Sequence, residues 1–62
     1  MKNDAPAISL AEQITCIRRE IGMRERVYPK SVSAGRMKAE AAERELAAIR
    51  AVLETLVSLQ TN

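Results

Sequence analysis

The side chains in this sequence that could do chemistry are few, and their types exclude most catalytic arrangements. The chain has 62 residues, no histidine and one cysteine, Cys16. Without histidine, neither a Ser–His nor a Cys–His pair can activate a nucleophile, and no His/Cys cage can hold a metal. The carboxylates Glu40, Glu43 and Glu45 are clustered, but such groups at an exposed helix start are usually solvated. We therefore predict a protein that is not an enzyme and uses no cofactor or metal.

The single thiol also bears on location. Cys16 could be a redox or dimer-linking thiol, but a free cysteine is more often a small hydrophobe at a helix or subunit contact, and we favour that interpretation. A lone thiol suits a reducing compartment. No stretch approaches the roughly 18 apolar residues that a membrane span needs. The sequence therefore predicts a cytoplasmic protein with no membrane association.

Positive charge is concentrated in the middle of the chain. Between residues 18 and 38, seven cations stand against two carboxylates, a local charge of +5, while the rest of the chain carries −3. Such segregation could place a basic tip against phosphate. Some of these cations have a carboxylate four residues away, and no aromatic platform for single strands accompanies them. We interpret the charge as a solvated or protein-docking face in preference to a nucleic-acid site. The candidate partner-binding residues are Arg18, Arg19, Arg26, Lys30, Arg36 and Lys38.

The elements that position these residues should be helices. A composition rich in Ala, Glu, Arg, Leu and Ile, with only two Gly and two Pro, is typical of an all-α chain. Residues 1–8 read as a flexible N-terminus and residues 9–60 as a single helical-hairpin domain. Ser9 and Glu12 have the spacing of a capping box, which predicts a helix over about 9–28. The helical spacing of its apolar residues marks one core-facing stripe: Leu10, Ile14, Ile17, Ile21 and Tyr28.

Two residues punctuate the middle of the chain. Pro29 has no N–H, so the first helix should end or kink near Tyr28. A short helical extension over about 29–34 should follow at an angle, with Gly35 as its left-handed cap. Gly22 lies inside the first helix, where either another backbone approaches closely or the helix tolerates the glycine.

A second helix is predicted over about 38–59. Its seam alternates spacings of four and three and comprises Ala42, Leu46, Ile49, Leu53 and Leu56. The two helices should form an antiparallel hairpin with a turn centred near residue 33, so that Ile21 faces Leu46. In this register Arg24 and Glu45 should form an ion pair, because a partly buried charge needs a partner.

Each predicted helix carries a second apolar line that one partner helix cannot cover. The chain is near the lower size limit for a domain that folds alone, so we expect two hairpins to bury these lines together as a homodimeric, coiled-coil-like four-helix bundle. The candidate dimer-interface residues are Cys16, Met23 and Val27 on the first helix and Ala48, Val52 and Leu59 on the second.

Two segments carry a resemblance to a known group. The run VYPKSVSAGRM at residues 27–37 and the pattern A-x-x-E-L-x-x-I-x-A-V-L at residues 42–53 resemble short hypothetical proteins encoded in phages and prophages of proteobacteria. The likeness covers about residues 9–56. It implies phage origin and a small role inside a bacterial host cell, with no catalytic residues to carry over, and the function of those relatives is unknown.

Two functional hypotheses follow. The first is a small interaction or regulatory protein that self-associates and binds a protein partner. The second is a nucleic-acid-binding accessory protein that uses the basic tip around residues 18–38.

Overall fold

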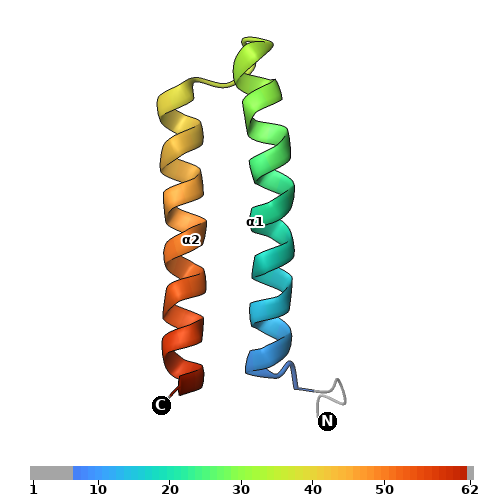
Figure 1. The fold of residues 1–62 in the computed structure, drawn as a ribbon, viewed down its shortest axis with the longest axis vertical. Helices are drawn as coiled ribbons and strands as arrows, with labels where there is room; N and C mark the ends of the chain where they lie inside the picture. The colour runs from blue at the N-terminus through green and yellow to red at the C-terminus, as the bar shows by residue number, and fades with distance from the viewer. Residues whose placement is uncertain (1–6, 62) are drawn as a thin grey trace, which may run out of the picture.

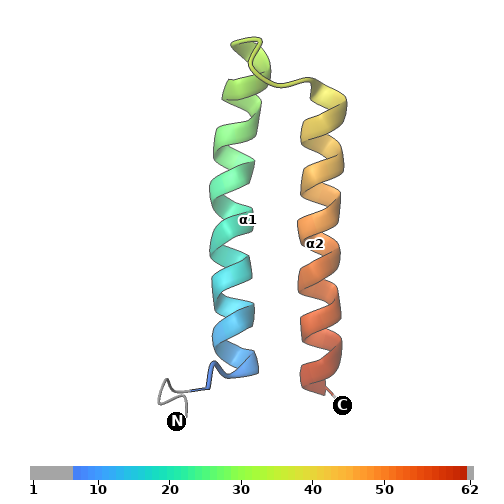
Figure 2. The same ribbon diagram turned by 180° about the vertical axis from the view of Figure 1, so that it is seen from behind.

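The chain folds as two antiparallel helices joined by a short connection. A computed structural model describes residues 7–61, and it comprises α1 (Leu10–Ser33) and α2 (Ala39–Thr61). The helices lie side by side over most of their length, with both chain ends at the same end of the molecule (Figure 1). The view from behind shows the same arrangement (Figure 2). The predicted all-α hairpin is confirmed. Most of the predicted flexible N-terminus, residues 1–6, lies outside the described residues.

The start of α1 is held by the predicted capping box. The Ser9 hydroxyl accepts a hydrogen bond from the Glu12 N–H at 3.0 Å, and the Glu12 carboxylate accepts one from the Ser9 N–H, also at 3.0 Å. These two bonds satisfy backbone donors that have no partner within the helix. Ser9 therefore sets where the helix begins, as the sequence indicates.

The helix does not end near Tyr28, so the predicted end at that residue is wrong, and the predicted helical extension over about 29–34 is continuous with the first helix. Pro29 lies inside α1, which runs without interruption to Ser33. Because proline has no N–H, the Glu25 carbonyl lacks the hydrogen bond that residue 29 would otherwise donate. Pro29 lies on the exposed side of the helix. Beyond the proline the ladder resumes, since the Ala34 N–H bonds to the Lys30 carbonyl at 2.9 Å.

The C-terminus of α1 is closed by a Schellman motif. Gly35 has φ of +79°, which confirms the predicted left-handed cap. Its N–H bonds to the Val32 carbonyl at 3.0 Å, and the Arg36 N–H bonds to the Ser31 carbonyl at 2.9 Å. Only glycine adopts this backbone conformation without steric cost, so Gly35 fixes the end of the helix.

The second helix begins close to its predicted start. The Ala42 N–H bonds to the Lys38 carbonyl at 3.0 Å, so Lys38 supplies the first helical acceptor of α2. Glu40 lies in the first turn, where its negative charge complements the positive end of the helix dipole. The helix continues to Thr61, slightly beyond the predicted end at residue 59.

The core between the helices is thin. The buried apolar side chains are Ile14 and Ile21 on α1 and Ala42 on α2, all members of the predicted stripes. The remaining stripe residues are half-buried: Leu10, Ile17 and Tyr28 on α1, and Leu46, Ile49, Leu53 and Leu56 on α2. The shortest dimension of the molecule is 16 Å, little more than one helix with its side chains. Nothing in the described chain therefore covers the two broad faces of the hairpin.

The turn between the helices lies later in the chain than predicted, because α1 continues to Ser33. The connection comprises residues 34–38, so it is centred near residue 36 instead of residue 33. In the predicted register Glu25 would face residue 41 or 42, but its carboxylate bonds to Arg50. Glu25 therefore contacts a residue further along α2 than the predicted register places opposite it, while the facing of Ile21 and Leu46 stays a prediction.

Candidate interaction surfaces

Two arginines are engaged by carboxylates. Arg24 pairs with Glu20, one turn earlier on α1, so the predicted ion pair between Arg24 and Glu45 is wrong. The hydrogen bond from Arg24 to Glu20 raises the pKa of the guanidinium above its already high ordinary value, and the Tyr28 hydroxyl adds to this effect. Arg24 is therefore tied to its own helix and does not link the two helices.

The ion pair that joins the helices was not foreseen from the sequence. The Arg50 guanidinium donates to the Glu25 carboxylate at 2.7 Å, from α2 to α1. Both side chains are about half exposed, at 52% and 47%, so solvent screens the pair and its contribution is at most about 1 kcal/mol. The sequence carries no signal for this pairing, because the two residues are brought together only by the register of the hairpin.

The two pairs use both carboxylates of the cationic stretch. Between residues 18 and 38 the only acids are Glu20 and Glu25, and each is taken by an arginine outside the candidate set. The six candidate partner-binding cations are all exposed, and within residues 7–61 none of them forms an ion pair. Arg36 and Glu40, which are four residues apart in the sequence, form no ion pair, because α2 begins only after Arg36.

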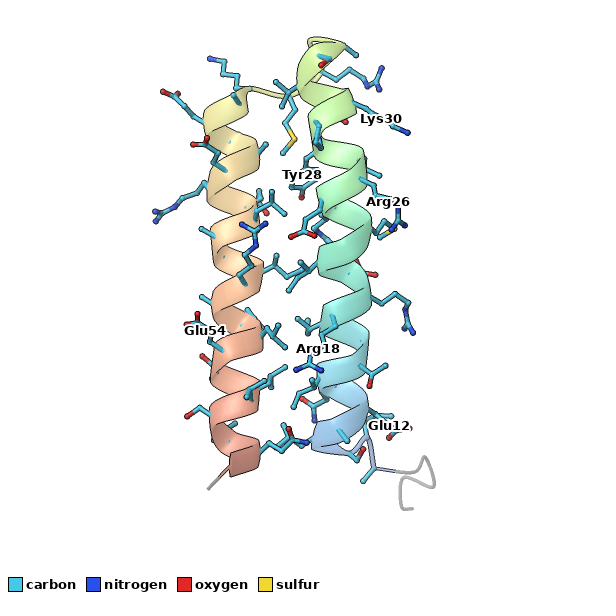
Figure 3. All side chains as sticks on the ribbon, in the orientation of Figure 1. Glu12, Arg18, Arg26, Tyr28, Lys30 and Glu54 are labelled. Atoms are coloured by element: carbon cyan, nitrogen blue, oxygen red, sulfur yellow. The ribbon has the colours of Figure 1, made fainter. Side chains whose placement is uncertain are left out.

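The structure divides these six cations among three places. Arg36 and Lys38 belong to the connection. Arg18 lies between the two helices in the view of Figure 3. Arg26 and Lys30 project from α1 on the side away from α2 (Figure 3), and Arg19, seven residues before Arg26, shares that side because seven residues complete nearly two turns. We call Arg19, Arg26 and Lys30 the outer basic line.

An apolar groove lies on one side of the hairpin, between the start of α1 and the second half of α2. Its walls come from both helices and from the segment before α1: Ile8, Glu12, Gln13, Cys16, Ile17, Val52 and Leu56. Cys16 belongs to the first predicted interface line and Val52 to the second. The structure therefore brings the two lines to the same side of the molecule. We call the side of the hairpin on which Cys16 and Val52 lie the groove face.

The other predicted interface residues extend the two lines. Met23 and Val27 follow Cys16 on α1 at spacings of seven and four, while Ala48 and Leu59 flank Val52 on α2 at spacings of four and seven. All four are exposed, Met23 at 41%, Val27 at 46% and Leu59 at 57% among them. Two short apolar lines thus remain open to solvent beside the groove.

Ile8 lines the groove, although the sequence pattern places it in the flexible N-terminus. It is 62% exposed, and its carbonyl accepts a hydrogen bond from the Gln13 side-chain amide at 3.3 Å. The available signal was an apolar residue directly before a helix N-cap, a position that often packs against the first turns of the helix.

Comparison with known proteins adds no family: no protein-family model, no curated protein and no solved structure matches this chain. Neither α1 nor α2 is apolar enough over a sufficient length to cross a membrane. Among residues 7–61, no three His, Cys, Asp or Glu side chains are grouped so that they could hold a metal ion.

Proposed function

We propose that this chain is a small, non-enzymatic interaction module that pairs with a second copy through its groove face and presents its exposed cations to an anionic partner. The observation that carries the proposal is the groove, where Cys16 and Val52, one from each predicted interface line, line a single apolar surface. The resemblance of residues 27–37 and 42–53 to short phage-encoded proteins implies a small role inside a bacterial host cell and gives no function of its own.

Exposed apolar area favours pairing. Val27, Val52 and Leu59 are each about half exposed, and Ile8 is more so. The buried core of the described part of the chain consists of only three residues. Full burial of a Val or Leu side chain contributes roughly 1.5–3 kcal/mol. A second copy that covers the groove face would therefore add stabilisation comparable to that of the core within one hairpin.

The groove face is also large enough for a stable dimer. A helix of 24 residues is about 36 Å long, and two helices packed at 8–10 Å present a face about 20 Å wide. The product, about 700 Å² per chain, approaches the roughly 800 Å² per partner of a standard specific interface. The two helices are nearly equal in length, so a second hairpin would cover the face from end to end as a four-helix bundle.

Sedimentation equilibrium with a matched pair of variants tests the pairing. The wild-type chain should sediment as a dimer at micromolar concentration. Val52→Asp places a carboxylate on the groove face and should weaken association at least tenfold, whereas Ala51→Asp, an equal charge one residue away on the exposed side of α2, should leave association nearly unchanged. A folded wild-type monomer at about 100 µM, or equal effects of the two variants, would contradict the proposed pairing.

A further inference from the structure

The geometry points to the orientation of the second copy: we infer that two hairpins pair with their connections at opposite ends, and that Glu12 of each copy binds Lys30 of the other. This inference rests on the proposed function, because it concerns how the groove face pairs. We call this orientation opposite-end pairing. The alternative, same-end pairing, places both connections at one end of the bundle.

Both orientations are two-fold symmetric, and they differ in which helices meet. In opposite-end pairing, each helix meets its own counterpart in the second copy and runs antiparallel to it. If the copies overlap from end to end, residues at equal distances from the middle of a helix face one another. The middle of α1 falls between residues 21 and 22, and the middle of α2 is residue 50. In same-end pairing, α1 instead meets α2 of the second copy.

The position of the groove favours opposite-end pairing. Its walls include Cys16 and Ile17 from the start of α1, and Val52 and Leu56 from the second half of α2. The groove therefore lies toward the end of the molecule that holds both chain ends (Figure 1). Same-end pairing would set one groove against the other and enclose a void, whereas the centres of stable interfaces are packed as densely as protein interiors. Opposite-end pairing covers each groove with the half of the second copy nearest its connection.

The edge of α1 carries opposite charges at matching distances from its middle. Glu12 and Lys30 are 18 residues apart, which is five full turns, so both lie on one line along the side of α1 away from α2 (Figure 3). Both are exposed, and neither forms an ion pair within residues 7–61. The Glu12 carboxylate accepts the Ser9 N–H and has further lone pairs for an ammonium group. Opposite-end pairing brings Glu12 to Lys30 of the second copy, once at each end of α1.

Same-end pairing gives Glu12 no such partner. In that orientation the start of α1 meets the end of α2 of the second copy, and the last turn of α2 carries no basic residue. Lys30 would meet the first turns of α2, where Glu40 and Glu43 lie, so the charge of Lys30 alone does not separate the two orientations. The carboxylate of Glu12 does separate them, because only opposite-end pairing supplies it with a cation.

The apolar residues of α2 on the groove face also suit antiparallel contact with their own counterparts. Val52 and Leu59, which are 45% and 57% exposed, lie after the middle of the helix. Ala41 and Ala48, which are also exposed, lie before it. Overlap about residue 50 sets Leu59 against Ala41 of the second copy, and Val52 against Ala48. Each large side chain then meets a small one, and symmetry repeats the fit.

Distances between spin labels measure the orientation directly. A nitroxide on Ser33→Cys, in a chain that also carries Cys16→Ala, marks the end of α1 next to the connection. The measurement is made at a concentration where sedimentation shows the labelled chain to be dimeric. Opposite-end pairing places the two labels about 35 Å apart along the bundle, whereas same-end pairing places them across the bundle, within about 20 Å. A distance within about 20 Å would overturn the inference.

A double-mutant cycle tests the ion pair. Glu12→Gln retains the capping box, which accepts either residue at this position, and should weaken association roughly three- to tenfold at low salt, since two exposed pairs are lost. In the background of Lys30→Glu, the same change removes a repulsion and should strengthen association. Within one chain the two residues are about 27 Å apart along α1, beyond the reach of screened charges, so this reversal can arise only between copies.

A matched background controls for net charge. Arg18→Glu makes the same charge change as Lys30→Glu, but residue 18 is two positions after Cys16 and so lies on nearly the opposite side of α1 from the groove face. In the Arg18→Glu background, Glu12→Gln should weaken association as it does in the wild-type chain. Equal effects of Glu12→Gln in the Lys30→Glu and Arg18→Glu backgrounds would overturn the assignment of the ion pair.

The orientation and the pairing fail separately. A chain that sediments as a folded monomer at about 100 µM contradicts the proposed pairing itself. A stable dimer whose labels lie within about 20 Å of each other contradicts only the orientation.

Discussion

Replacing each of the two glycines by alanine should change stability in opposite directions. Gly22 lies inside α1 with a negative φ, while Gly35 has φ of +79°. A methyl group at Gly22 would meet only the Arg26 guanidinium, at 4.0 Å, which is an ordinary van der Waals contact. At Gly35 the methyl group would enter open space, so any cost there comes from the backbone conformation alone.

The magnitudes follow from these environments. Glycine inside a helix is about 0.8–1 kcal/mol less favourable than alanine, so Gly22→Ala should raise the free energy of unfolding by about 1 kcal/mol. Gly35→Ala forces a left-handed conformation on a residue with a Cβ, at roughly 1–2 kcal/mol, and should lower stability by that amount. For a domain of this size, 1 kcal/mol corresponds to a shift of about 4–8 °C in Tm.

Circular dichroism at 222 nm, followed during heating and during urea titration, measures both effects. All variants should be compared at one chain concentration, because self-association makes Tm depend on concentration. Wild-type chain should melt between the two variants. A lower Tm for Gly22→Ala would refute the reasoning, because it would mean that another backbone, from a second copy, approaches Gly22 closely.

Three further predictions concern the hairpin and its surface. Glu25→Gln removes the carboxylate of the ion pair between the helices and should lower the free energy of unfolding by at most about 1 kcal/mol, and by less in high salt. Urea titration at two salt concentrations measures this, and a loss of stability that salt does not change would contradict an electrostatic origin. Pro29→Ala restores a donor to the Glu25 carbonyl and should raise Tm and helical ellipticity, and a decrease in both would show that the proline does more than interrupt the ladder. Cys16 is free and exposed in one hairpin. It should react with a thiol reagent more slowly as chain concentration rises, because pairing covers the groove, whereas the rate in the control variant Val52→Asp should depend less on concentration. A wild-type rate that does not depend on concentration would contradict this prediction.

The helices and their ends were predictable because their causes are local. The Ser9–Glu12 capping box and the left-handed Gly35 each depend on residues within one turn. The apolar stripes were also legible, since helical periodicity alone places Ile14 and Ile21 on one face. The predicted helix end at Pro29 is wrong because proline's lack of an N–H does not by itself end a helix. In α1 it removes only the hydrogen bond to the Glu25 carbonyl, and the helix continues to Ser33.

The candidate surfaces were only partly predictable. The six cations were identified from composition, but their division into an outer basic line, an inter-helix position and a connection depends on the rotation of α1 about its axis and on where that helix ends. The pairing of Glu25 with Arg50 could not be predicted for the same reason, because an error of three residues in the centre of the turn displaces the facing residue by six.

By itself, then, the sequence determined two helices, their caps, their apolar stripes and a cationic middle, because each depends on near neighbours in the chain. Only the tertiary structure decided that the lines of Cys16 and Val52 meet on one groove face, and which cations remain without an ion-pair partner within residues 7–61. These outcomes depend on how far α1 extends past Pro29, since that length sets the register and rotation of one helix against the other.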